Sequence, residues 1–502
     1  MTTTRLLPRA TPESQGVDPA ALTRLVEVLD EIHDVHSLMV LRHGRVVAEA
    51  WWDPFTADEP HRMYSVSKSV TATAVGIAVG EGLLTVDDRV VDLLPDDAPE
   101  HPDAHLAAMT VRDLLTMTSG HATDTMSFTL HNLHRPGSSW ARDILAAPVT
   151  YEPGTRFVYD TGATYLVAAI LHRLTGQRLL DYLTPRLFAP LGITGATWEQ
   201  CPRGIDVGGY GLTLTTEQLA TLGQLWSQRG RWGDDQLVDA SWVDEMTSAQ
   251  VPNGPDENVD WNQGYGYQFW RCRFGAFRAD GAFGQFAVVR PDLDLVVVLT
   301  SGTTRTAEEL EAVLELLGPA CTDVPSSAPG APSSVPDGGA PFTLDELAVA
   351  VPGGSASTLV GAMVEGSEFL LQHHDGAAVD EGGHGRAFLR WHSVAVRHDA
   401  DVIELSWTTG AHGSPRTVRC GAGHWVRGSV ELDGEPLPVA AAAAWTAHDT
   451  LVARMVWQGT PFALDVTLQF GGDGEGRHVE VAVDQNVAFG PTALLRATGL
   501  GV

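Results

Sequence analysis

Ser65 and Lys68 are the two side chains of this sequence best suited, by type and spacing, to nucleophilic catalysis. A serine hydroxyl becomes a good nucleophile when a base takes its proton, and a lysine amine is such a base when burial or nearby positive charge lowers its pKa. Lys68 is the one lysine among 32 basic side chains, and the other 31 are arginine, which stays protonated. Either Lys68 is a chance survivor in a lysine-poor composition, or this position requires a titratable amine.

The segment 65–81 (SVSKSVTATAVGIAVGE) predicts a buried helix that would bring this pair together, because its residues are small and apolar nearly all round. Residues three apart lie on one helical face, so the Ser65 hydroxyl and the Lys68 amine can meet. The N–H groups at the helix start are free to stabilise an oxyanion. A lysine in an apolar helix is costly to bury without a purpose, which favours the catalytic interpretation.

The segments around this helix predict an α+β domain whose two ends share one antiparallel sheet, flanked by helices. Near the start, an amphipathic helix precedes a hairpin, and near the end, strands with a turn precede a closing helix. The middle is mostly helical in pattern. These segments are 18–32 (helix), 37–52 (hairpin), 110–250 (helical middle), 266–300 (strands, with the turn at 291–294) and 307–317 (helix).

A change of composition divides the chain into two predicted domains. Residues 319–341 are rich in Pro, Ser, Gly and Ala without periodicity, which is typical of a linker. Strand-like runs separated by Gly-rich turns follow, so 342–502 predicts an all-β barrel or sandwich. The prediction is therefore an α+β domain at 1–318, a linker at 319–341 and a β-rich domain at 342–502.

The stretch 63–95 (MYSVSKSVTATAVGIAVGEGLLTVDDRVVDLLP) resembles the nucleophile helix of the serine β-lactamase and DD-peptidase (penicillin-recognising) superfamily, class C-like. The segment 110–121 (TVRDLLTMTSGH) resembles the part that follows in that superfamily. The resemblance covers roughly residues 10–305 and is nearest to the branch of esterases and 6-aminohexanoate-dimer hydrolase. It implies that Ser65 is the nucleophile and Lys68 its proton partner. The C-terminal part resembles the lipocalin-like β-domains appended to some members.

The second motif of the superfamily, Tyr-x-Asn, matches Tyr159-Asp160-Thr161. The resemblance implies that Tyr159 acts as general base or proton shuttle beside Lys68, and a phenol near an ammonium can have a depressed pKa. Thr161 stands where β-lactamases and DD-peptidases carry Asn. That departure argues against β-lactam and peptidoglycan substrates.

The third motif, Lys-Thr-Gly or His-Thr-Gly, finds its best match in Ala279-Asp280-Gly281, which has no cation at its first position. Since that cation binds a substrate carboxylate in β-lactam-recognising members, its loss argues against the same substrates. The pattern Gly281-x-x-Gly284-Gln285 resembles the esterase branch. It implies an oxyanion hole made of the Ser65 and Ala282 N–H groups, with the glycines permitting close backbone approach. A plain β-bulge is the alternative.

Further candidates for the substrate pocket are His121, Trp261 and Tyr265. The two aromatic residues could equally belong to the core, and a lone His such as His121 is more often structural. His373 and His374 are adjacent and would face opposite ways on a strand, so no metal site is expected. No H-E-x-x-H, phosphate-binding loop or G-x-S-x-G motif is present, so no cofactor is implied.

The net charge of -31 disfavours nucleic acid and anionic lipid as partners. No signal-like start and no run of 18 apolar residues is seen, and the four cysteines are far apart, so we expect a cytoplasmic protein without a disulfide framework. The expected partner is a small-molecule ester or amide substrate. The oligomeric state is not readable from the sequence.

The leading hypothesis is a serine hydrolase, an esterase or amidase that works through a Ser65 acyl-enzyme, with Lys68 and Tyr159 as general base. The alternative is an acyltransferase or peptide cyclase that passes the same acyl group to an amine or alcohol. A third hypothesis is a catalytically silent, penicillin-binding-like protein. Retention of Ser65, Lys68 and Tyr159 weighs against it.

Overall fold

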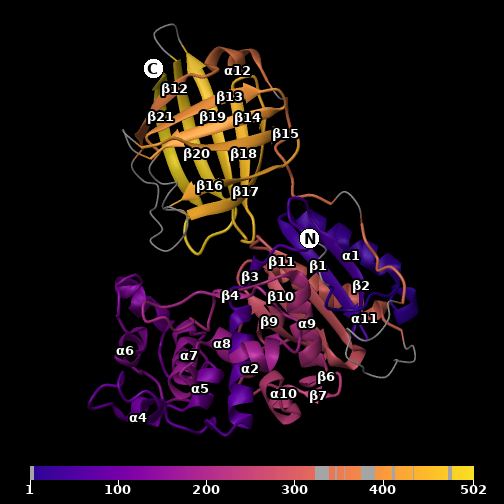
Figure 1. Cartoon of the computed structure of the whole chain (residues 1–502), viewed down its shortest axis with the longest axis vertical. Helices are drawn as coiled ribbons and strands as arrows, with labels where there is room; N and C mark the ends of the chain where they lie inside the picture. The colour runs from indigo at the N-terminus through magenta and orange to yellow at the C-terminus, as the bar shows by residue number, and fades with distance from the viewer. Residues whose placement is uncertain are drawn as a thin grey trace.

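Six antiparallel strands, in the order β2-β1-β11-β10-β9-β8, form the central sheet of the N-terminal domain (Figure 1). The computed structural model describes residues 5–322, 338–344, 347–355, 357–374, 391–409, 413–432, 435–472 and 477–501. Strand β1 from the start of the domain pairs with β11 from its end, which confirms the predicted α+β sheet. The strands are β1 (Val35–Arg42), β2 (Arg45–Trp51), β8 (Trp270–Arg271), β9 (Phe277–Gly281), β10 (Gln285–Arg290) and β11 (Leu295–Ser301).

Helices cover both faces of this sheet because its strands are apolar on both sides. In β11, Val296 and Val298 pack in one core cluster with residues of helices α2 and α9, whereas Val297 and Leu299 pack in another with α1 and α11. This alternation follows from the two-residue repeat of a strand. The covering helices are α1 (Pro19–Ile32), α2 (Val66–Gly80), α9 (Thr216–Ser227) and α11 (Thr306–Ala320).

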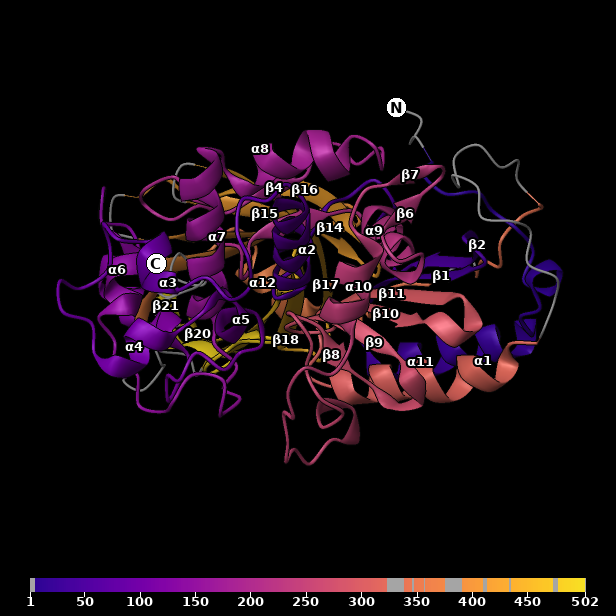
Figure 2. The ribbon, with the colours of Figure 1, turned by 90° about the horizontal axis from the view of Figure 1, so that it is seen from below.

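The middle of the domain is mostly helical, as predicted, and packs around α2 (Figure 2). Its helices are α3 (Val90–Leu93), α4 (Ala104–Ala108), α5 (Val111–Leu115), α6 (Trp140–Leu145), α7 (Thr161–Thr175), α8 (Leu179–Leu183) and α10 (Ala240–Thr247). Short helical turns are η1 (Glu13–Gln15), η2 (Thr125–Asn132), η3 (Thr184–Phe188), η4 (Val259–Trp261), η5 (Arg273–Gly275) and η6 (Pro291–Leu293). The short strands are β3 (His61–Arg62), β4 (Thr197–Trp198), β5 (Leu212–Leu214), β6 (Arg231–Trp232) and β7 (Asp235–Gln236).

The C-terminal part is a β-barrel, the first of the two predicted all-β alternatives. Nine strands close into a ring through the parallel pairing of β15 with β17, and β16 pairs on β17 as a tenth strand. Trp391 and Trp407 stack inside it with centroids 5.0 Å apart. The elements are α12 (Leu359–Val364), β12 (Glu368–His373), β13 (Ser393–Asp399), β14 (Val402–Thr408), β15 (Arg416–Ala422), β16 (Val426–Leu432), β17 (Glu435–Trp445), β18 (Thr450–Trp457), β19 (Ala463–Gly472), β20 (Arg477–Gln485) and β21 (Ala493–Gly501).

The segment between the two domains follows the edge of the first. Helix α11 continues to Ala320, and the chain then forms bridges from Phe342 and Ala348 to residues of β2 and Asp53. The middle of the predicted 319–341 linker, residues 323–337, lies outside the described residues. The boundaries at 318 and 342 stay a prediction.

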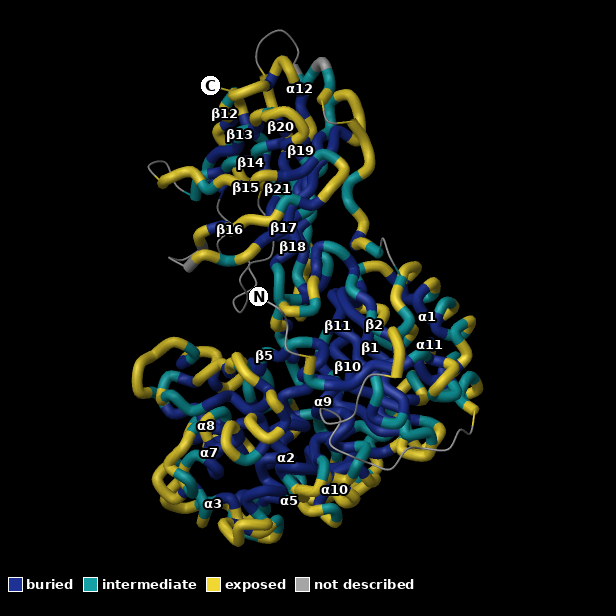
Figure 3. The backbone as a smooth tube through the Cα atoms, turned by 45° about the vertical axis from the view of Figure 1, so that its right-hand side comes forward, coloured by how far each residue is buried: buried dark blue, intermediate teal, exposed yellow. Residues whose placement is uncertain are grey.

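The barrel packs directly on the N-terminal domain, as Figure 3 shows. The Arg454 guanidinium reaches Asp34, and Asn486 Nδ2 donates to the carbonyl of Gly302, just after β11, at 2.8 Å. Apolar residues of the barrel, such as Val456, belong to the same core cluster as α1 and α11. Across the described ranges, no helix is both long and apolar enough to cross a membrane.

Candidate active site

Ser65 occupies the N-cap position of α2 without a capping hydrogen bond from its side chain, and Lys68 lies one turn further into the helix. The Lys68 Nζ donates to Ser65 Oγ at 3.0 Å, so the predicted pair does meet. Figure 2 shows α2 near the centre of the domain. Lys68 is almost completely buried there. Its small and apolar residues let α2 pack on all sides, which explains why the sequence pattern is apolar all round.

Burial lowers the pKa of Lys68 to about 8, because the charged amine loses hydration. The amine also donates to the Gly209 carbonyl at 2.9 Å and to Thr161 Oγ1 at 3.3 Å. The sequence interpretation allowed for nearby positive charge as a second cause. The charges acting on Lys68 are instead the carboxylates of Asp124, Asp160 and Asp280, which oppose the lowering. Lys68 therefore has a usable neutral fraction at neutral pH.

Tyr159 lies beside both residues, in the loop that leads into α7. The Lys68 Nζ lies 4.9 Å from the centre of its ring, and the phenol hydrogen-bonds with the Ser65 side chain. Burial raises the pKa of Tyr159 above its usual value, which differs from the depressed pKa expected from the sequence. The reason is that loss of hydration outweighs the hydrogen bond that favours the phenolate. The Tyr159 phenol therefore keeps its proton at neutral pH in this arrangement.

The turn between β9 and β10 supplies the second candidate oxyanion donor, Ala282. Gly281 lies against the segment that precedes Ser65: a Cβ on Gly281 would come 2.4 Å from the Met63 carbonyl oxygen. Gln285 fixes the turn, since its Nε2 donates to the carbonyls of Ala282 and Ser301 at 3.0 and 2.8 Å. Gly284 has φ +92° and leaves no room for a side chain beside Glu309. These contacts hold the turn that carries Ala282, and Gly281 at its start lies against the segment that leads into Ser65.

The chain departs from the β-lactam-recognising motifs at Thr161 and Ala279, and the structure shows the surroundings of both residues. The Thr161 hydroxyl accepts a hydrogen bond from the Lys68 amine, so the residue at the third position of the second motif faces the candidate base. Ala279 is buried in the core cluster that contains α2. The neighbouring cation, Arg278, is fully buried with its guanidinium on Asp280 and under Trp261, 4.2 Å from the ring centre. Arg278 is thus engaged within the protein.

Three predicted pocket residues lie behind the site. His121 is buried, with Nδ1 3.0 Å from Ser119 Oγ and 3.6 Å from an Asp160 oxygen. Trp261 covers Arg278, and buried Tyr265 packs edge-on against Tyr159 at 6.4 Å between ring centres. His121 therefore supports the position of Asp160, Tyr265 that of Tyr159, and Trp261 that of Arg278.

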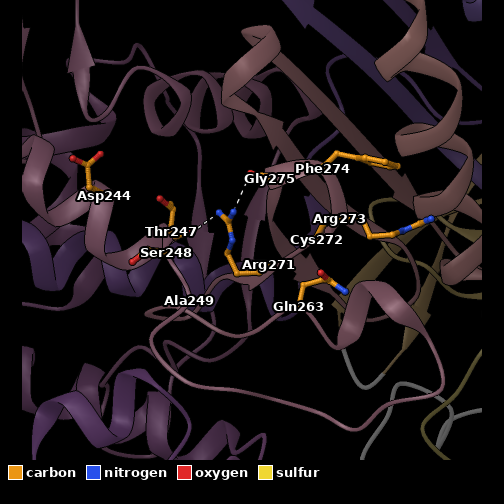
Figure 4. A pocket seen from close by; sticks show the side chains of 10 residues that line it. All are labelled: Asp244, Thr247, Ser248, Ala249, Gln263, Arg271, Cys272, Arg273, Phe274 and Gly275. Atoms are coloured by element: carbon orange, nitrogen blue, oxygen red, sulfur yellow. Dashed lines mark hydrogen bonds between the residues drawn. The ribbon is translucent and has the colours of Figure 1, made fainter.

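An open hollow of about 530 Å³ lies elsewhere on the domain (Figure 4). Ser65, Lys68 and Tyr159 are not among its lining residues. The guanidinium of Arg271, which lines this hollow, donates to the carbonyls of Thr247 and Gly275 at 2.8 and 3.1 Å. It is therefore separate from the candidate active site.

Sequence reasoning missed two contributors around Lys68. Asp124, just before η2, accepts from the Thr161 N–H at 3.0 Å and acts on the Lys68 charge. Gly209 presents its carbonyl to Lys68, and a Cβ there would come 2.8 Å from Thr161 Cγ2. The adjacent glycines at 208–209 were the available signal of a close backbone approach. Within the part of the chain that is described, no group of His, Cys, Asp or Glu side chains could hold a metal.

The family model described as Beta-lactamase matches residues 23–318, and the chain therefore belongs to this family of serine hydrolases. It is 26% identical over 317 residues to 6-aminohexanoate-dimer hydrolase of Paenarthrobacter ureafaciens, covering 58% of this chain and 79% of the relative. It is 29% identical over 327 residues to penicillin-binding protein 4 of Amycolatopsis lactamdurans, covering 57% and 82%.

Both domains together are covered by some of the solved structures that the chain resembles. The crystal structure of SurE with D-Leu matches with a TM-score of 0.50 and 20% sequence identity, covering 95% of this chain and 100% of that one. Shorter matches, at 28% identity, are esterase EstB of Burkholderia gladioli (36% of this chain, 53% of the relative) and acyltransferase mokF of Monascus pilosus (29% and 40%). The family thus has relatives named as hydrolase, esterase and acyltransferase.

Proposed function

We propose that this protein hydrolyses an ester or amide bond of a small molecule through a Ser65 acyl-enzyme. The observation that carries the proposal is the 3.0 Å contact between Ser65 Oγ and the amine of the one lysine, whose pKa is lowered to about 8. A neutral amine at this distance can accept the proton that the serine must lose.

In acylation, neutral Lys68 takes the proton of Ser65 while Oγ attacks the substrate carbonyl. The N–H groups of Ser65 and Ala282 then stabilise the oxyanion. Tyr159, held neutral by its raised pKa and hydrogen-bonded to Ser65, donates a proton to the leaving oxygen or nitrogen and recovers one from protonated Lys68. Water resolves the acyl-enzyme by the same path in reverse.

The residue types at Thr161 and Ala279, where β-lactam-recognising members carry Asn and a cation, favour neutral acyl substrates over β-lactams. A carboxylate-binding cation is not supplied by Ala279, and Arg278 is occupied by Asp280. Small esters and amides without a carboxylate at that position are the expected substrates.

The test compares wild type with Ser65→Ala and Lys68→Arg on p-nitrophenyl acetate and butyrate, a p-nitroanilide, a linear amide dimer and nitrocefin. We expect clear ester turnover in wild type, loss of ~10³-fold or more in both variants, and poor nitrocefin turnover. Lys68→Arg keeps a cation but not a titratable base, so its loss separates base catalysis from charge alone. Equal rates in wild type and Ser65→Ala would refute the proposal.

Acyl transfer is the second candidate, and the match to an enzyme named acyltransferase favours keeping it. The same acyl-enzyme would then pass its acyl group to an amine or alcohol. Adding such an acceptor to the ester assay distinguishes the two functions. Hydrolysis predicts free acid as the main product, whereas transfer predicts an acceptor adduct and faster release of p-nitrophenol.

A further inference from the structure

Four aromatic rings meet where the barrel contacts the catalytic domain, and two of them adjoin the oxyanion donors. Tyr64 precedes Ser65, and Phe283 follows Ala282; their ring centres lie 5.5 Å apart. Phe462 and Phe489 come from the barrel. We call Tyr64, Phe283, Phe462 and Phe489 the junction cluster.

The barrel rings contact both catalytic-domain rings. Phe489 lies 4.8 Å from Phe283 and 6.1 Å from Tyr64, and Phe462 lies 6.0 and 6.4 Å from them. Phe462 lies between β18 and β19, and Phe489 between β20 and β21. In Figure 1 the barrel stands over the part of the catalytic domain that contains β3 and β11. The cluster therefore combines both domains beside one reaction centre.

The backbone at this cluster is strained. Tyr64 has φ +47° and Phe283 has φ +67°, a region that bulky residues rarely adopt. Such strain persists where the surrounding structure enforces it and gathers at functional sites. Both strained residues adjoin an oxyanion donor, and both rings face the barrel loops.

One bridging side chain holds the two barrel loops in place. Asn486 donates to the carbonyls of Gly302 and Pro461, at 2.8 and 2.9 Å, and accepts from the Ala463 N–H at 2.7 Å. Phe489 nevertheless remains 76% exposed. A large apolar ring left in water beside Tyr64, the residue before Ser65, offers apolar surface for a substrate to cover.

We propose that the junction cluster binds an apolar acyl substituent of the substrate, so that the barrel sets acyl specificity. This inference rests on the proposed function. The leaving group must lie within reach of the proton donor Tyr159, whose ring contacts are with Tyr265 and Trp270 rather than with the cluster. The acyl substituent departs from the carbonyl in the other direction, toward the rings that flank Ser65 and Ala282. Hydrophobic burial there favours longer acyl chains or a phenyl group.

The first experiment measures kcat/KM for p-nitrophenyl acetate, butyrate, hexanoate and 4-phenylbutanoate, which share one leaving group. In wild type we expect kcat/KM to rise with acyl size. Phe489→Ala should lower the hexanoate-to-acetate ratio by about tenfold, and Phe489→Leu should restore much of it. Phe274→Ala is the matched control, because Phe274 is also an exposed ring (51%) but contacts Arg273 and Arg290 instead. It should leave the ratio unchanged.

The second experiment needs no turnover. Binding of methyl 4-phenylbutanoate to Ser65→Ala is followed by saturation-transfer NMR, with and without Phe489→Ala. Weaker binding in the double variant supports the inference even if the hydrolase proposal fails. Unchanged binding and an unchanged acyl ratio would overturn it. A third outcome would also overturn it: sedimentation shows a dimer that Phe489→Ala abolishes, while the hexanoate-to-acetate ratio stays constant. The Phe489 ring would then contact a second copy of the chain instead of the substrate.

Discussion

Gly281→Ala tests whether the close approach of β9 to the start of α2 builds the oxyanion hole. The added Cβ would lie 2.4 Å from the Met63 carbonyl oxygen, and backbone offers no flexible end that could turn away. Relieving the contact requires a backbone shift on the order of 0.5 Å or more, which is about the tolerance of a productive catalytic geometry. Because Ala282 adjoins this position, the shift would misplace one of two oxyanion donors. Loss of such a donor lowers kcat by ~10²–10³-fold.

The assay is the kcat for p-nitrophenyl butyrate, measured together with thermal unfolding so that only folded enzyme is compared. Overpacking by one methyl costs about 1–3 kcal/mol of stability, so the variant should remain folded at 25 °C. Gly80→Ala, at the last residue of α2, is the matched control, because an added Cβ there meets nothing within 4 Å. It should retain wild-type activity. A folded Gly281→Ala enzyme with kcat within threefold of wild type would refute this account of the site.

Two further predictions concern ionisation. Lys68 must be neutral to act as a base, so kcat/KM of the wild type should rise with pH, with a midpoint at about 8. The Asp124 carboxylate raises the pKa of Lys68, so Asp124→Asn should shift that midpoint to lower pH. An upward shift in the pH–rate profile of Asp124→Asn would contradict this. Burial raises the pKa of Glu309 to about 8 from its usual 4.5, so the folded protein keeps a proton that the unfolded chain releases, and the contribution of Glu309 to stability declines as pH rises from 4.5 to 8. Glu309→Gln has no carboxyl group and so lacks this loss. In urea unfolding, its free energy of unfolding relative to wild type should therefore increase between pH 5 and pH 8 by on the order of 3 kcal/mol. A difference in free energy of unfolding that does not change with pH would show that Glu309 is ionised in the folded protein.

The local parts of the site were predictable from the sequence because they depend on short-range geometry. Three-residue spacing on a helix sets the contact of Ser65 with Lys68, and the apolar composition of 65–81 determines that this helix is buried. Strand and helix periodicity likewise predicted the shared sheet. The position of Tyr159 came from a family resemblance, since it is 91 residues away from Lys68 in the chain and no local rule connects them.

Other features were decided by tertiary packing alone. The acidic surroundings of Lys68 come from separate segments at Asp124, Asp160 and Asp280, and the raised pKa of Tyr159 reflects burial that composition does not reveal. In the sequence, nothing distinguishes Phe462 and Phe489 from other residues of the β-rich region. Their contact with Tyr64 exists because the barrel packs on the N-terminal domain. Periodicity specifies which face of an element is apolar, whereas long-range contacts depend on how whole elements pack. For that reason the sequence determined the contact of Ser65 with Lys68, and the fold determined the charge environment of that pair and the aromatic surface proposed to bind the acyl group.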